Sequence, residues 1–356
     1  MRVALLANIK PQGLDLWNRT ADGGVDDTYA EWDTFETVDA VRAALASHPD
    51  VECEIVEAVP EIALPRLMVR AYDIVFNIAE GLHGADREAQ FPAVLEMLRI
   101  PYTGSGPWTL ATALDKYRTK EILAQGGVPC GRFAVTTDRA ASLANLLPGL
   151  EYPVVVKPTS EGSSKGVKNS SFVNTDTELR REIARIIAEY GQHAIVEEFL
   201  PGREFTVAVI GNGREARVLP IVEIKLGELP PEANGIYSYE AKWVYDTAEH
   251  PLDIFSCPAE TTPELTKEIS DVVLAAYNTL GCRDWSRLDV RLDRHGHPNI
   301  IEVNPLPGIL PNPEDNSCFP KAARTAGMSY NETMLAVLRA GCTRYGIELS
   351  VTPKGS

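Results

Sequence analysis

The chain has 356 residues, of which 44% are hydrophobic and 24% charged, a composition typical of a folded protein with two or three domains rather than a disordered one. The formal net charge of -16 disfavours nucleic acid as a partner, because an acidic surface repels the phosphate backbone. No apolar run is long enough to cross a membrane, and the six cysteines are scattered without a C-x-x-C pair, so we expect free thiols in a cytoplasmic protein.

Strands and helices alternate over the first hundred residues. Short apolar runs predict strands, and apolar residues at helical spacing predict helices between them. A polar segment at 15–31 is predicted to be a long loop. The alternation indicates an open, parallel α/β sheet, and we assign it to an N-terminal domain over 1–105. The expected elements are strands at 3–7, 51–56 and 74–78 and helices at 34–45 and 88–98.

The second part of the chain, 106–196, is predicted to be a central domain. Its first helix, at 108–125, contains Lys116, and a strand at 154–158 ends at Lys157. A loop of small residues follows at once, and such a loop can bring backbone N–H groups close to phosphate oxygens. A helix at 177–190 has a cap at Thr175 or Asp176 and ends at Gly191, and a strand at 194–196 closes the domain.

The third part, 197–356, is predicted to be a C-terminal domain. Strands are expected after Gly202 and at 218–224, a helix at 263–280 and a last helix at 331–340. Glu197, Glu198 and Glu204 flank the first turn, and their carboxylates suit the hydroxyls of an adenosine ribose. A solvated acidic face is the alternative for these three residues.

A predicted hairpin over 285–308 is the stretch around which the chain is organised. Side chains alternate along a strand, so Arg287 and Asp289 share one face of the first strand, and Glu302 and Asn304 share one face of the second. If the two faces coincide, hard oxygen ligands meet beside a cation. Such ligands suit Mg²⁺ bound together with substrate phosphates. The alternative is a surface hairpin with solvated charges.

The order of these segments resembles that of the ATP-grasp enzymes, and most closely the D-alanine–D-alanine ligase family. The resemblance covers the chain from about Phe76 onward, and the combination is specific although each segment alone is weak. The matching segments are 100–106, Asp115-Lys116, Val156-Lys157-Pro158, 161–166, Glu197 with 204–207, 239–242, 281–290, 302–308 and 326–329.

This resemblance implies three α/β domains with a nucleotide between the central and C-terminal domains. It implies an ATP-dependent ligase that joins two amino acids through an acyl phosphate, in peptidoglycan synthesis or in specialised metabolism, and by analogy a homodimer. The nucleotide is expected on Lys116, Lys157, Lys242, Glu161, Gly162, Ser163, Ser164, Gly166, Glu197, Glu198, Phe199, Leu200 and Glu204, and two Mg²⁺, with Mn²⁺ as a substitute, on Asp289, Glu302 and Asn304.

The resemblance also implies an oxyanion site at Arg287 and the N–H of Gly308, contact of Ser163 with the reacting carboxylate, and Ser317 on the second substrate. The first-substrate pocket departs from the family pattern: Asn8-Ile9-Lys10-Pro11 replaces a glycine-rich motif, Glu80 and His83 lie in an altered segment, and Trp243 replaces a tyrosine. A different first amino acid is therefore expected. A ligase for another amino acid or amine, and a nucleotide-binding sensor without catalysis, are the alternatives.

Overall fold

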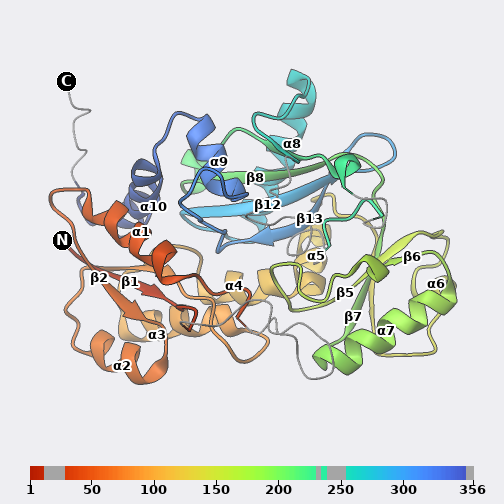
Figure 1. Ribbon diagram of the computed structural model, residues 1–356, viewed down its shortest axis with the longest axis horizontal. Helices are drawn as coiled ribbons and strands as arrows, with labels where there is room; N and C mark the ends of the chain where they lie inside the picture. Colours follow the sequence, from red (N-terminus) through yellow and green to blue (C-terminus); the bar gives the residue numbers. More distant parts are fainter. Residues whose placement is uncertain (12–28, 230–233, 239–253, 350–356) are drawn as a thin grey trace.

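The computed structural model describes residues 1–11, 29–229, 234–238 and 254–349. Three β-sheets follow one another along the chain, and helices pack on them (Figure 1). The N-terminal sheet lies at the lower left of that view, the C-terminal sheet above it, and the central sheet at the lower right. The predicted α/β class is confirmed.

The N-terminal sheet has three parallel strands in the order β2-β1-β3. Its middle strand is buried on both faces: Val3 and Leu5 face the core that contains α1, whereas Ala4 and Leu6 face the core beneath α2 and α3. Helices on both faces are the usual environment of a parallel sheet, and the predicted open sheet is confirmed. The elements are β1 (Arg2–Ala7), α1 (Phe35–Ala46), β2 (Glu52–Glu57), α2 (Pro60–Met68), β3 (Ile74–Ile78), the 3-10 helix η1 (Arg87–Ala89) and α3 (Gln90–Leu98).

The central sheet is antiparallel, with strand order β4-β7-β5-β6, and α7 packs on it. The predicted caps of α7 are confirmed: Thr175 accepts a hydrogen bond from the N–H of Glu178, and Gly191 ends the helix with a φ of +63°. The predicted strand that ends in Lys157-Pro158 is also confirmed. The elements are β4 (Phe133–Thr136), α6 (Leu143–Leu146), β5 (Val154–Pro158), η2 (Asn169–Ser171), β6 (Phe172–Val173), α7 (Asp176–Tyr190) and β7 (Ala194–Glu198).

The C-terminal sheet has the order β11-β10-β8-β12-β13, with β9 paired to β8, and helices pack on both faces. The strand predicted at 218–224 is wrong as a single element. Pro220 lies between two short strands, and proline cannot donate a ladder hydrogen bond. The elements are β8 (Glu204–Ile210), η3 (Gly213–Glu215), β9 (Arg217–Val218), β10 (Val222–Ile224), η4 (Leu226–Glu228), β11 (Phe255–Ser256), α8 (Pro263–Thr279), β12 (Trp285–Leu292), β13 (Pro298–Asn304), α9 (Cys318–Thr325) and α10 (Tyr330–Tyr345).

The helix predicted at 108–125 is two helices, α4 (Pro107–Leu114) and α5 (Lys116–Gln125). The break falls at Asp115, whose backbone is extended and whose side chain accepts hydrogen bonds from the N–H groups of Tyr117 and Arg118. A carboxylate that can cap a helix competes with continuation of the preceding one. Lys116 therefore stands at the first position of a helix rather than in the middle of one.

The N-terminal and C-terminal sheets share one apolar core. Trp285 of β12 packs edge-to-face on Phe76 of β3 and on Phe319 of α9, with ring centroids 5.7 and 5.5 Å apart. Beside this core the fully buried Asp284 accepts a hydrogen bond of 2.8 Å from the N–H of Gly104 and forms an ion pair of 2.8 Å with Arg344. Arg344 lies in the last turn of α10, and this helix extends five residues beyond the predicted end at 340.

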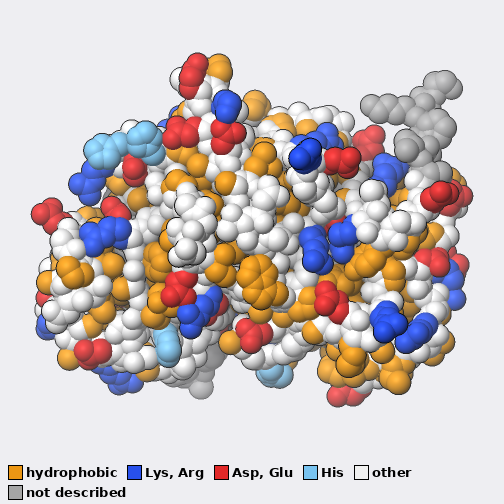
Figure 2. Space-filling model, turned by 180° about the vertical axis from the view of Figure 1, so that it is seen from behind, with side chains coloured by type: hydrophobic (Ala, Val, Ile, Leu, Met, Phe, Trp, Pro, Cys, Tyr) orange, Lys and Arg blue, Asp and Glu red, His pale blue; other side chains and the backbone are white. Residues whose placement is uncertain are grey.

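The molecular surface carries charges of both signs. Figure 2 shows acidic, basic and hydrophobic side chains interspersed over one face, without a continuous basic stripe on that face. Within the described residues no helix is long and apolar enough to cross a membrane.

Candidate active site

One cavity of about 350 Å³ is lined by all three sheets and by the loops between them. It receives the glycine-rich loop after β5, the turn between β7 and β8, the two strands of the hairpin and the loop before α1. Of the predicted site residues the following line it: Glu80, Lys116, Lys157, Glu161, Gly162, Ser163, Ser164, Glu197, Glu198, Phe199, Leu200, Glu204, Arg287, Asp289, Glu302, Asn304, Gly308 and Ser317.

Four predicted site residues do not line the cavity in the described structure. Lys242 and Trp243 lie outside the described residues. Gly166 has a φ of +74°, and a Cβ there would meet the ring of Pro158 at 2.5 Å, so its part is to shape the loop. His83 is exposed at a turn that reverses at Gly84, and its position does not support the predicted contact with a substrate.

The hairpin brings its charged side chains together as predicted. β12 and β13 are antiparallel, with Arg287 opposite Asn304 and Asp289 opposite Glu302. The guanidinium of Arg287 donates to both oxygens of Asp289, at 3.1 and 2.9 Å, and the amide of Asn304 donates to Asp289 at 3.3 Å. A register shift after Asp289 accommodates the extra residue Ile301 in β13. The two predicted faces therefore coincide.

These oxygen donors fit a Mg²⁺ site in which the protein supplies only some of the metal's ligands. Among the described residues no three Asp, Glu, His or Cys side chains form a group that could hold a metal ion by themselves. Asp289 and Glu302 are adjacent carboxylates, and Asn304 adds a neutral oxygen. Mg²⁺ is commonly held by one or two carboxylates together with phosphate oxygens and water. The donor set fits that mode of binding.

Two lysines project from opposite sides toward the cavity. The ammonium of Lys116 contacts Glu302 at 2.8 Å and donates to the backbone carbonyl of Glu161. Burial by itself would raise the pKa of Glu302, but the positive charge of Lys116 prevails and lowers it to about 2. Lys157 is paired with Glu197 at 2.7 Å, and this partner raises the pKa of Lys157 against the opposing effect of burial. Both lysines are therefore cations close to the hairpin carboxylates.

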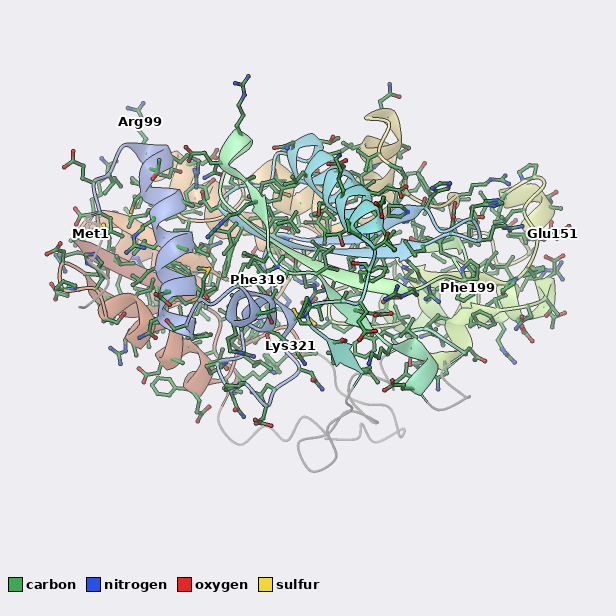
Figure 3. All side chains as sticks on the ribbon, turned by 90° about the horizontal axis from the view of Figure 1, so that it is seen from above. Met1, Arg99, Glu151, Phe199, Phe319 and Lys321 are labelled. Atoms are coloured by element: carbon green, nitrogen blue, oxygen red, sulfur yellow. The ribbon has the colours of Figure 1, made fainter. Side chains whose placement is uncertain are left out.

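The side of the cavity that is predicted to receive adenosine contains a buried ion pair that the sequence analysis did not identify. Arg291 donates to Glu204 at 3.1 Å, and its guanidinium carbon lies 4.7 Å from the centroid of the Phe199 ring. Figure 3 shows Phe199 where the green central part meets the C-terminal part. Leu200 is buried beside it. Arg291 thus holds the predicted ribose ligand Glu204 in place and packs on an aromatic ring.

A second unpredicted contact joins the N-terminal part to the glycine-rich loop. Glu31 accepts three hydrogen bonds from Arg87, at 2.7, 2.8 and 3.1 Å, and a fourth of 2.9 Å from the N–H of Gly162. Arg87 also donates to the carbonyl of Ser160 at 3.1 Å. Both Glu31 and Arg87 have side chains that are only 7% exposed. The loop is therefore tied to the first-substrate side of the cavity by charge-assisted hydrogen bonds.

The glycine-rich loop has an unusual backbone at its centre. Ser163 and Ser164 are consecutive non-glycine residues in the left-handed region, with φ of 50° and 61°. Such conformations cost about 1–3 kcal/mol each and persist where surrounding contacts determine them. Ser164 donates to the carbonyl of Tyr237, and Lys165 forms an ion pair with Glu161 at 2.8 Å. The first contact holds the loop against the C-terminal part, and the second joins two residues within the loop.

The loop after β13 positions the predicted oxyanion and second-substrate residues. Ser317 is buried at the start of α9, donates to the carbonyl of Gly308 at 3.0 Å and accepts from the N–H of Leu310 at 3.2 Å. A Cβ on Gly308 would approach the Ser317 oxygen no closer than 4.0 Å. Gly308 and Ser317 are thus held together, and both line the cavity with Arg287.

Some of the missed residues carry a signal in the sequence, and others do not. Arg87 and Glu88 stand four and three residues before Phe91, which places them on the buried side of the helix that follows. Two charges on a buried side are a sign of a polar site. Glu31 carries no such signal, because its partners are 56 and 131 positions away along the chain.

Known proteins resemble this chain over most of its length. Residues 122–339 match the family described as the D-ala D-ala ligase C-terminus. An uncharacterized protein, y4sG of Sinorhizobium fredii, is 34% identical over 320 residues, which cover 88% of this chain and 90% of the relative. The D-alanine–D-alanine ligase of Desulforudis audaxviator is 36% identical over 307 residues, 84% of this chain and 90% of that one.

Solved structures agree on the fold. The D-alanine–D-alanine ligase of Bacillus anthracis, complexed with ATP, superposes with a TM-score of 0.69 at 20% identity, covering 97% of this chain and 99% of that one. At this identity the likeness concerns the fold, and it is the ATP-grasp arrangement of the three sheets described above. On the family match and the identities to its relatives together, the chain belongs to the D-alanine–D-alanine ligase family of ATP-grasp ligases.

Proposed function

We propose that the protein joins the carboxylate of one amino acid to the amine of a second at the expense of ATP, through an acyl phosphate. The observation that carries this proposal is the meeting of Lys116 and Lys157 with the hairpin carboxylates in one cavity. A triphosphate bound there would meet both the lysine cations and the proposed metal ligands. Phosphoryl transfer depends mainly on such positioning and charge neutralisation.

In the first step a carboxylate oxygen of the acyl donor attacks the γ-phosphorus, and ADP leaves. The glycine-rich loop would cover the phosphates with its backbone N–H groups, and Ser163 would contact the attacking carboxylate. Lys116 and Lys157 would neutralise the oxygens on which negative charge accumulates. The contact of Lys116 with the backbone of Glu161 supports this role, because it links the lysine to the loop itself.

In the second step a neutral amine attacks the carbonyl of the acyl phosphate, inorganic phosphate leaves and the amine loses a proton. Arg287 and the N–H of Gly308 would stabilise the negative oxygen that forms on the carbonyl carbon. Burial and Asp289 act on the Arg287 guanidinium in opposite directions, and the balance raises its pKa, so it stays charged. Ser317 would hold the carboxylate of the second amino acid.

Asp289, Glu302 and Asn304 would hold two Mg²⁺, or Mn²⁺ in their place. When bound there, the metal would neutralise phosphate charge. The protein itself contributes Arg287, which keeps Asp289 ionised and oriented through two hydrogen bonds. Glu302 has its pKa lowered to about 2, so it is ionised as a ligand must be.

D-alanine is the first amino acid to test, because several relatives are named D-alanine–D-alanine ligase. A ligase for another amino acid or amine is the second candidate, and the altered first-substrate wall favours it. A nucleotide-binding sensor without catalysis is less compatible with the site, since Arg287, Asp289, Glu302 and Asn304 all face the cavity.

The test is ATP-dependent phosphate release with Mg²⁺ across D- and L-amino acids, singly and in pairs, with mass spectrometry of the products. The proposal expects a dipeptide or amide and one phosphate per bond formed. Arg287→Met should abolish product formation while ATP binding persists, and Arg283→Met outside the cavity is the matched control. ATP binding by the natural chain without turnover on any pair would instead establish the sensor.

The cellular setting follows from the same proposal. All six cysteines are free thiols in the structure, which supports a reducing compartment such as the cytoplasm. Synthesis of a peptidoglycan precursor is the pathway that the names of the ligase relatives suggest, with specialised metabolism as the alternative. A homodimer is proposed by analogy with the family alone.

A further inference from the structure

The first-substrate wall of the cavity is unusually rich in carboxylates. Glu31, Asp33, Glu80 and Glu88 all line this wall, and they come from the loop before α1 and from the segment between β3 and α3. Glu31 raises the pKa of Glu88, and Glu88, Glu31 and Asp33 all raise the pKa of Glu80. The four carboxylates therefore lie within electrostatic range of one another. Among the described lining residues, two lysines act on these carboxylates: Lys10 on Asp33, and Lys116 on Glu88.

The cations near this wall are already engaged. Arg87 donates three hydrogen bonds to Glu31 and lies 3.6 Å from Glu161. Lys165 pairs with Glu161 at 2.8 Å, and Lys116 pairs with Glu302 at 2.8 Å. The positive charge of Lys10 opposes the rise in the pKa of Asp33. The backbone N–H of Lys10 also donates to the backbone carbonyl of Asp33 at 2.8 Å. The charge of Glu31 is thereby compensated, and that of Asp33 is compensated in part.

Glu80 and Glu88 remain without a cation of their own within the described structure. Neither forms a hydrogen bond or a close ion pair there, although both face the cavity. Glu88 is only 9% exposed, and that exposure is toward the cavity it lines. A buried carboxylate without a partner is costly, and structures tolerate one where a ligand or a proton completes it. Two carboxylates without a partner on one wall, Glu88 buried and Glu80 half-buried, therefore point to a ligand with two complementary charges.

Resting on the proposed ligase function, we propose that the acyl donor is a diamino acid, whose α-ammonium and second ammonium are received by Glu80 and Glu88. An ordinary α-amino acid brings one ammonium and can satisfy one of the two carboxylates. The other would stay buried and unpaired, or protonated. A second amino group on the substrate removes that penalty, so the wall selects for it.

The ionisation of these groups in the free protein supports the same conclusion. Burial, together with the neighbouring carboxylate Glu31, raises the pKa of Glu88 to about 8, and burial together with Glu88 raises the pKa of Glu80 well above its ordinary value. Without a ligand Glu88 therefore holds a proton at neutral pH, and Glu80 binds a proton more readily than an ordinary glutamate does. A dicationic substrate would take the place of those protons.

The experiment compares each diamino acid with its neutral isostere, so that size is held constant. The full-length protein with ATP and Mg²⁺ is given 2,4-diaminobutyrate against norvaline, and ornithine against norleucine, in both enantiomers and with a fixed set of second amino acids. Phosphate release and product mass are measured. We expect kcat/KM for the best diamino acid to exceed that of its isostere by about 100-fold, the loss that follows from leaving one partner of a buried charge pair alone.

The variants Glu80→Gln and Glu88→Gln test which side chains carry the preference. Each should lower the ratio of diamino to neutral kcat/KM at least tenfold, whereas Glu61→Gln, the same change at an exposed site of α2, should leave the ratio as it is. Each of the two cavity variants should also raise the melting temperature of the ligand-free protein, because an uncompensated buried acid is removed.

Two results would overturn the inference, and they differ from one another. Equal turnover of diamino and neutral acids would refute the diamino substrate and leave the ligase function standing. ATP binding without product from any acid would refute the ligase function and the diamino substrate with it.

Discussion

The contact between Glu31 and Arg87 allows a sharp test of how the glycine-rich loop is held. Three hydrogen bonds join the two side chains, and each side chain is 7% exposed. Arg87→Met would leave Glu31 buried without its hydrogen-bonded cation, with Lys165 still 3.9 Å away, and would release the carbonyl of Ser160. Removal of one partner of a buried ion pair costs about 3–5 kcal/mol. We expect a loss of that size in the free energy of unfolding, measured by urea titration.

The double variant separates the ion pair from other effects of the substitution. Arg87→Met combined with Glu31→Gln removes both charges, so it should be more stable than the sum of the single variants predicts, by about 2 kcal/mol or more. KM for ATP should rise in both single variants, because Glu31 also accepts the N–H of Gly162 in the loop.

The matched control is an exposed ion pair of the same kind. Arg66 and Glu54 lie 2.7 Å apart, but their side chains are 47% and 48% exposed. The corresponding cycle, Arg66→Met with Glu54→Gln, should give a coupling below about 1 kcal/mol and no change in KM for ATP. Additive effects at Arg87 and Glu31, within about 0.5 kcal/mol, would refute the reasoning.

Three further predictions concern the site and its ionisation. Asp289→Asn and Glu302→Gln should each lower kcat at least 100-fold and raise the Mg²⁺ concentration for half-maximal phosphate release, while Asp271→Asn, an exposed carboxylate of α8, should change neither. Gly162→Ala should raise KM for ATP about tenfold, because the new Cβ would lie 2.6 Å from Glu31 Oε1, and Gly227→Ala in open space is its control. Burial raises the pKa of Asp33 from 3.8 to about 6. Between these two pH values the folded state keeps a proton that the unfolded state has lost. The stability from this group is complete below pH 4 and is lost as the pH rises through 6, by up to about 3 kcal/mol, and urea titrations should show Asp33→Asn without that loss. A pH dependence unchanged in Asp33→Asn would contradict the assignment.

The sequence predicts the nucleotide and metal side of the cavity because those residues are fixed by local patterns. Alternation along a strand places Asp289 and Glu302 on coincident faces, and the loop after Lys157 is recognisable by its small residues. Helix caps at Thr175 and Thr262 are equally local. Where one strand or helix decides the geometry, the sequence is sufficient.

The first-substrate wall could not be derived in the same way. The partner of Glu31 in the glycine-rich loop is 131 positions away, and no pattern within either segment indicates that they meet. The family resemblance places His83 near the substrate, but the chain turns at Gly84 and His83 is exposed. The break at Asp115 depended on a choice between continuing one helix and capping the next, which helix propensity alone does not decide.

The domain boundaries predicted at 105 and 196 remain predictions, but the packing bears on how the parts can move. The N-terminal and C-terminal sheets share an apolar core through Phe76, Trp285 and Phe319, whereas the central sheet meets the N-terminal part through ions at Arg87. Separating the N-terminal sheet from the C-terminal sheet would expose these aromatic rings to water. Buried ions that separate into water regain their hydration, which offsets much of the attraction that is lost. Nucleotide exchange is therefore expected to proceed by a hinge motion of the central sheet, with the other two sheets moving as one rigid body.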